Sequence, residues 1–168
     1  MAKNKNLLIA LSFFAILLTM IGCSDRQKES SFPKDNCGYP QKNIMVINGK
    51  EEVLPGFTDI LMGEKFTHRV TAKKQKDGFV TVMVPKASAI NQWCIEESED
   101  VKVIMYKTES LLENAKEKIE GASDEIQMFK FSSETNHVVK LKWVNINQIG
   151  KAFSEKEENY LLEIEIEE

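Results

Sequence analysis

The chain has 168 residues, of which 42% are hydrophobic, and a formal net charge of −4 at pH 7. A chain of this length forms one domain with its own core, which needs neither a metal nor a disulfide framework to fold. Arginine occurs only as Arg26 and Arg69, and the charge is mildly acidic. These features exclude the clustered positive charge that binds a nucleic-acid backbone, so nucleic acid is not a predicted partner.

The first 22 residues have the order of a secretory signal. Lys3 and Lys5 supply a positive start, residues 7–21 are almost continuously apolar, and Gly22-Cys23 provides a small-residue cleavage point. The apolar run is shorter than a typical membrane-spanning helix, although an uncleaved membrane anchor is the alternative. The stretch therefore predicts export.

The end of this signal, Met20-Ile21-Gly22-Cys23, resembles the lipobox of bacterial lipoproteins. In that family cleavage precedes the cysteine, whose thiol carries diacylglycerol and whose new amino group is acylated, for example with palmitate. The resemblance implies a protein of the cell envelope that a lipid on Cys23 holds in a membrane. Ser24, in place of aspartate, implies the outer membrane of a Gram-negative host, facing the periplasm or the cell surface.

The rest of the chain divides into a tether and a domain. Residues 23–36 are polar beyond the cysteine and lack periodicity, which predicts a flexible tether. Residues 37–168 are predicted to form a single domain. Removal of residues 1–22 takes away two of the 22 basic residues and no acidic one, so 20 basic residues face 26 acidic ones and the net charge becomes −6.

Cys37 and Cys94 remain after the lipidated cysteine is set aside. In an oxidising compartment we expect a disulfide between them, with two free thiols as the alternative. Closing a loop of this length stabilises by about 4 kcal/mol in the chain-entropy model. Two cysteines without a histidine pair make a poor zinc site, and we expect no metal or other cofactor.

Short β-branched stretches separated by turn residues predict a mainly β domain. Residues 43–48 form one expected strand, ended by the turn pair Asn48-Gly49. Residues 65–72 and 79–84 are expected to form a hairpin across a charged loop. Residues 87–97 are compatible with either a helix or an irregular loop.

The second half of the chain contributes one expected helix and four expected strands. Residues 110–120 predict the helix, because Ser110 and Glu113 match a capping box and Gly121 suits the end. The strands are expected at residues 101–106, 125–131, 138–144 and 159–167.

The last two of these strands have the clearest alternation. Val139, Leu141 and Trp143 share one face of the first, with Lys140 and Lys142 on the other. In the second, four apolar residues alternate with Glu163, Glu165 and Glu167. Antiparallel pairing would bring lysines and glutamates together across a solvated face.

About seven strands with spaced turns predict an immunoglobulin-like antiparallel β-sandwich with the helix at 110–120 inserted in it. The alternative is an α+β sheet with that helix packed on one face.

Residues with catalytic chemistry are scarce. His68 lies on an apolar strand face, which favours a core position, and His137 lies in a predicted turn. The acidic residues 96–100 lack the alternating spacing of a calcium loop and are expected to be solvated. The chain is therefore not predicted to be an enzyme.

The two tryptophans differ in context. Trp143 lies within a strand and is predicted to be in the core. Trp93, beside Cys94, is either an anchor for a partner or a core residue stacked on the disulfide, and we favour the core.

Three segments follow or precede strands at characteristic places: residues 85–93 (PKASAINQW), 121–124 (GASD) and 145–147 (NIN). Their placement resembles that of three loops in chagasin-type inhibitors of papain-like cysteine peptidases, which have an immunoglobulin-like fold. In that family the loops enter the peptidase cleft and carry Asn-Pro-Thr-Thr-Gly-(Tyr/Phe), Gly-x-Gly-Gly and Arg-Pro-Trp. These motif residues are largely replaced here, so the resemblance supports the fold more than the activity.

We therefore expect a lipid-anchored, non-enzymatic binding or structural module with a protein partner in the envelope. A chagasin-like inhibitor of a cysteine peptidase is the alternative. Both hypotheses place partner binding in the same loops, whose candidate residues are Ala87, Ser88, Asn91, Trp93, Gly121, Ser123, Asn145 and Asn147.

Replacement of Cys23 by serine tests the lipid anchor. We expect Cys23→Ser to leave the precursor unlipidated and to release it from membranes, because the thiol that carries the lipid is gone. Fractionation of cells after a high-pH wash checks this, with unchanged Cys23 as the reference. Retention of the variant in the detergent-soluble membrane fraction would contradict the prediction.

Overall fold

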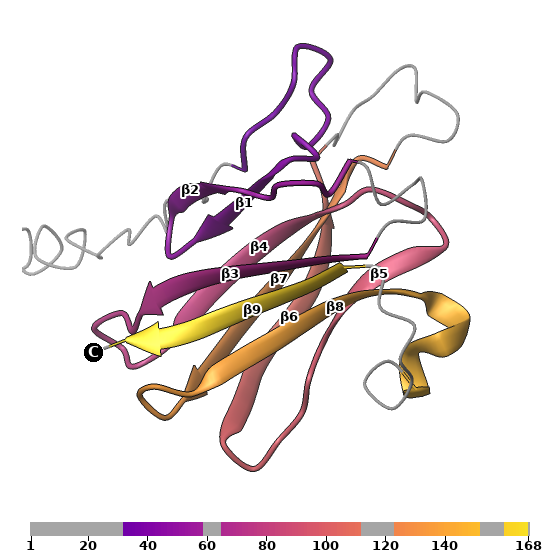
Figure 1. Cartoon of the computed structure of the whole chain (residues 1–168). Coiled ribbons are helices and arrows are strands. Elements are labelled where there is room, and N and C mark those ends of the chain that lie inside the picture. The colour runs from indigo at the N-terminus through magenta and orange to yellow at the C-terminus, as the bar shows by residue number, and fades with distance from the viewer. Residues whose placement is uncertain (1–31, 59–64, 112–122, 152–159, 168) are drawn as a thin grey trace, which may run out of the picture. The chain divides into compact units, whose positions relative to one another are not determined.

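A computed structural model describes residues 32–58, 65–111, 123–151 and 160–167 (Figure 1). This part of the chain is mostly β, as predicted, and contains nine strands in two sheets rather than about seven strands. The five-stranded sheet has the order β2 (Lys50–Val53), β1 (Ile44–Ile47), β4 (Val80–Lys86), β7 (Glu125–Ser133) and β6 (Val101–Ser110). The four-stranded sheet has the order β3 (Phe66–Lys73), β9 (Tyr160–Glu167), β8 (Val138–Asn145) and β5 (Asn91–Ile95), and the 3₁₀ helix η2 (Ile146–Lys151) follows β8.

Alternation of apolar and polar residues explains how the two sheets pack. In β9, Tyr160, Leu162, Ile164 and Ile166 are buried, while the intervening residues are partly exposed. These side chains share one hydrophobic cluster with inward-facing residues of β4 and β7 in the other sheet. The two sheets therefore enclose a common core.

Aromatic rings fill the core between the turn after β2 and the four-stranded sheet. The ring of Phe57 lies 5.1 Å from that of Trp93, 5.2 Å from that of Trp143 and 5.5 Å from that of Tyr160. Offset and edge-on contacts of this kind add stabilisation beyond the burial of area. The prediction that Trp143 is a core residue is confirmed, since it is 3% exposed.

A second, smaller cluster covers the outer face of the five-stranded sheet. Phe32, which is 2% exposed, packs there against Val46, Met83 and Ile126. The backbone amides of Cys37 and Tyr39 donate to the carboxylate of Asp35, and this closes a compact turn. Residues 32–36, expected to be tether, therefore belong to the folded unit that begins at Phe32.

The Cys37–Cys94 disulfide is not formed, and that prediction was wrong. Both thiols are free, with Cys37 exposed and Cys94 half-buried. The segment that carries Cys37 packs against the outer face of the five-stranded sheet, whereas Cys94 belongs to β5 at an edge of the other sheet. A disulfide requires closely approaching Cβ atoms, and this arrangement separates the two residues.

One expectation about the pairing of strands was also wrong. The strands β3 and β4 do not form a hairpin, because the intervening turn carries the chain from one sheet to the other and β3 pairs in parallel with β9. Ser110, the expected first residue of the helix, is the last residue of β6. Residues 112–120 of the predicted helix lie outside the described residues.

The antiparallel pairing of β8 with β9 is confirmed, with Lys140 opposite Glu163. The ion pairs nevertheless run to residues outside this strand pair. Lys140 lies 3.4 Å from Glu96, and Glu163 lies 2.6 Å from Arg69 on β3. Lys142 is only 2% exposed, so its expected position on a solvated face was wrong.

Candidate interaction surface at one end of the sheets

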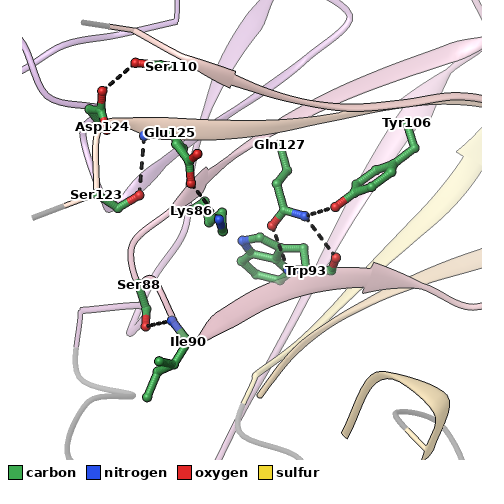
Figure 2. Close-up of polar contacts among 10 residues, drawn as sticks. All are labelled: Lys86, Ser88, Ile90, Trp93, Tyr106, Ser110, Ser123, Asp124, Glu125 and Gln127. Carbon is green, nitrogen blue, oxygen red and sulfur yellow. Dashed lines mark hydrogen bonds and ion pairs between the residues drawn. The ribbon is translucent and has the colours of Figure 1, made fainter. Parts of the chain in front are cut away.

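The connection between β4 and β5 is a tight turn with an exposed apolar tip. The Ser88 hydroxyl accepts a hydrogen bond of 3.2 Å from the amide of Ile90, which is typical of serine turns (Figure 2). Ile90 is 61% exposed. The turn therefore presents an isoleucine to solvent on a fixed backbone.

The segment after β8 lies directly beside this turn. Asn91 pairs with Asn145, and the amide of Ile146 donates to the carbonyl of Ile90 at 2.9 Å. The side chain of Asn145 accepts from the amide of Asn147 at 2.9 Å, which starts η2. The first and third predicted loops are thus joined by backbone hydrogen bonds.

The start of β7 completes the same end of the molecule (Figure 2). Lys86 at the end of β4 is opposite Glu125, and their charged groups lie 2.6 Å apart. The hydroxyl of Ser123 accepts from the amide of Glu125, and Ser110 bonds to the carboxylate of Asp124. The described part of the second predicted loop therefore adjoins the first.

We call this region the loop end and define it as residues 86–91, 123–125 and 145–149. It brings together six of the eight candidate residues as neighbours at one end of the sheets: Ala87, Ser88, Asn91, Ser123, Asn145 and Asn147. Gly121 lies outside the described residues.

Apolar side chains are exposed at the loop end. Ile90, Ile146 and Ile149 are 61%, 42% and 43% exposed, and they are three of the six large hydrophobic residues that are exposed in the described part of the chain. Exposed apolar side chains that gather in one place are typical of an interaction site, whereas scattered ones are not.

Trp93 is not part of this surface. It is 1% exposed, and its ring stacks on that of Phe57 at an angle of 24°. The preference for a core position was correct, although the ring stacks on an aromatic side chain rather than on a disulfide. Its inclusion among the partner-binding residues was wrong.

Trp93 instead joins the two sheets through a buried polar group that the sequence analysis missed. The side-chain amide of Gln127 on β7 accepts from the Trp93 amide at 2.8 Å and donates to the Trp93 carbonyl at 3.2 Å (Figure 2). It also donates to the hydroxyl of Tyr106 at 2.7 Å, and the indole of Trp93 donates to the carbonyl of Pro85 at 3.0 Å. Three hydrogen bonds therefore hold β5 against the opposite sheet next to the loop end.

The sequence contains only a weak indication of this contact. Gln127 occupies the same face of β7 as Phe129 and Phe131, which are core residues. A glutamine in an inward-facing position requires hydrogen-bond partners, but the pattern does not identify them.

The remaining titratable residues do not assemble into a catalytic group in the described part of the chain. Burial lowers the pKa of His68, against the opposing effect of Glu52. His137 lies 4.0 Å from Asp100, a solvated pair in a turn region. Burial raises the pKa of the Cys94 thiol, which makes its reactive thiolate less available. The described residues also contain no group of three or more side chains that could hold a metal ion.

No protein-family model, curated protein or solved structure matches the chain. Across the residues described in the structure, none of the helices has the length and apolar character needed to cross a membrane.

Replacement of Gln127 tests its role between the sheets. We expect Gln127→Leu to lower the free energy of unfolding by about 2–4 kcal/mol, because the buried Trp93 amide and carbonyl lose their partners. Tyr106→Phe, which removes one hydrogen bond, should cost about 1 kcal/mol. Urea denaturation measures both, and equal costs for the two variants would contradict this role.

Proposed function

We propose that the chain is a lipid-anchored lipoprotein of the cell envelope that binds a protein partner through its loop end and catalyses no reaction. The observation that carries this proposal is the convergence of three segments, far apart in sequence, at one end of the sheets. Loops held by a rigid β framework are where binding residues are commonly found.

The packing around the loop end favours a preorganised binding surface. Hydrogen bonds from Ile146 to Ile90 and from Ile90 to Ser88 hold two of its segments in place before any partner arrives. Preorganisation lowers the entropic cost of association. The exposed isoleucines at this end would gain by leaving water for an apolar groove.

An immunoglobulin-like fold is the second part of the proposal. The order β1-β4-β7-β6 corresponds to the A-B-E-D sheet of that fold, and β5-β8-β9 corresponds to its C-F-G sheet. In this assignment the loop end holds the connections B–C, D–E and F–G. The strand β2 and the parallel strand β3 are additions to the basic seven.

The lipid would set where this module works. One acyl chain alone binds a membrane only marginally, so the several chains of a lipoprotein cysteine are required for stable anchoring. Only eight residues separate Cys23 from Phe32, where the folded unit begins. Fully extended, they reach about 30 Å, which restricts the partner to the neighbourhood of the membrane.

The second candidate is a chagasin-like inhibitor of a papain-like cysteine peptidase. What favours it is that the three segments placed by the resemblance are neighbours at one end, as a wedge into a cleft requires. The replaced motif residues leave the general binding module as the leading proposal.

Photo-cross-linking in intact cells tests the loop end. A photoreactive residue at Ile90 should cross-link a discrete protein, and Ile146→Asp in the same chain should reduce the yield about 10-fold, because a charge would enter an apolar contact. The matched control places the probe at Lys76, in the exposed turn between β3 and β4. Equal cross-linking from both positions, or none at Ile90, would contradict the proposal.

Inhibition assays decide between the two candidates. The chain from Ser24 to Glu168 is mixed with a papain-like cysteine peptidase, and we expect no inhibition at micromolar concentration because the motif side chains are absent. Tight and reversible inhibition that Ile90→Asp abolishes would instead establish the inhibitor.

A further inference from the structure

A hollow lies along the outer edge of β3. Its volume is about 440 Å³, and it is lined by Glu52 of β2 and by Arg69, Val70 and Thr71 of β3. Strand β3 is at one end of the four-stranded sheet and pairs there with β9. Figure 1 shows the hairpin of β1 and β2 on the side of β3 away from β9. The hollow therefore separates the edge of β3 from the hairpin.

The direction of the peptide groups of β3 follows from one hydrogen bond. The carbonyl of Lys73 accepts a bond of 2.6 Å from the side chain of Asn48, in the turn between β1 and β2. This carbonyl therefore points away from β9. In a parallel pair both peptide groups of a residue point to the same side, and successive residues alternate. Those of Arg69 and Thr71 thus face the hollow, whereas those of Val70 face β9.

Two contacts with the β1–β2 hairpin mark the limits of the hollow. One is the bond from Asn48 to Lys73, and the other is a hydrogen bond between His68 and the backbone of Val53. Between these limits, and within the described part of the chain, no group outside the sheet bonds to the backbone of residues 69–71. Arg69 and Thr71 therefore offer two backbone donors and two acceptors to an added strand.

The opposite end of the same sheet is closed. Bonds from Ile146 to Ile90 and from Glu96 to Lys140 show which peptide groups of β5 face β8. By alternation those of Trp93 face the edge, and the side-chain amide of Gln127 occupies them. The two ends of the four-stranded sheet therefore differ, because the centre of β5 is capped and the centre of β3 borders a hollow.

The outer face of β3 is complementary to acidic side chains. Strand β9 places Glu163 opposite Arg69 and Glu165 opposite Thr71. One oxygen of Glu163 accepts from Nε and Nη2 of Arg69, whose side chain remains 62% exposed. A guanidinium has five N–H donors, so Arg69 can bind a second carboxylate from the side of the hollow.

We propose that the edge of β3 from Arg69 to Thr71 binds an extended segment of a protein partner, which adds as a strand and places an acidic side chain against Arg69. Backbone hydrogen bonds would supply affinity and alternate side chains specificity. Strand β3 of a second copy is a poorer complement, because it would bring basic Arg69 and Lys73 against the same residues. The edge shares no residue with the loop end, so this inference goes beyond the proposed function.

Hydrogen exchange followed by nuclear magnetic resonance tests the edge. The full chain is purified in detergent, and the probe is a peptide with the sequence of residues 160–167, whose glutamates already complement β3. In the chain alone, the amides of Arg69 and Thr71 should exchange fast, and those of Val70 and Ala72 slowly, because the latter bond to β9. Addition of the probe should slow exchange at Arg69 and Thr71 about 10-fold or more.

Two variants provide the second test. Arg69→Glu should raise the dissociation constant of the probe about 10-fold and should favour a control peptide in which lysines replace the three glutamates. Thr71→Pro removes an N–H that faces the hollow and keeps the bonds to β9, so it should abolish binding while circular dichroism shows a folded chain.

Three results would overturn the proposal. The first is slow exchange at Arg69 and Thr71 in the chain alone, which would show that the edge is already occupied, by a second copy if the protection grows with the concentration of the chain. The second is a probe that leaves the exchange of these two amides unchanged. The third is normal binding of the probe by Thr71→Pro.

Discussion

One buried side-chain amide, that of Gln127, sets the spacing and register of the two sheets next to the loop end. Gln127 is 0% exposed, and both its oxygen and its nitrogen are hydrogen bonded. A buried polar group left without a partner costs about 1–3 kcal/mol, so this amide favours the position of β5 in which it meets Trp93. The bond from the Trp93 indole to Pro85 strengthens the same junction from β4.

The same contact also supports the turn at the loop end. Because the Gln127 amide occupies the outward peptide groups of Trp93, it caps β5 at its centre and also holds the turn that leads to Ile90. The strand β6, at the end of the other sheet, pairs with β7 regularly except for a bulge at Ile104.

Much of the β framework could be predicted, because alternation within a strand is a local property. The alternating pattern from Tyr160 to Ile166 corresponds to strand β9. The turn pair Asn48-Gly49 corresponds to an observed turn, in which the two residues have positive φ angles of 52° and 80°. In contrast, the sequence of a strand does not determine which other strand lies beside it in the sheet. Alternation in β3 does not say that its neighbour is β9. Residues 87–97, which include β5, were compatible with a helix or an irregular loop. Two cysteines indicate a disulfide only if the fold brings them together, and the polar partners of Gln127 are set by the packing of two sheets.

The measurement that tests this account most directly is the hydrogen exchange of the Trp93 amide in the folded chain, followed by nuclear magnetic resonance. This amide points away from β8 at the edge of a sheet, where exchange is ordinarily fast, and only the side chain of Gln127 protects it. The account predicts exchange as slow as that of core amides such as Leu141, and fast exchange in Gln127→Leu. Fast exchange in the unmodified chain would show that the sheets are not joined at this point.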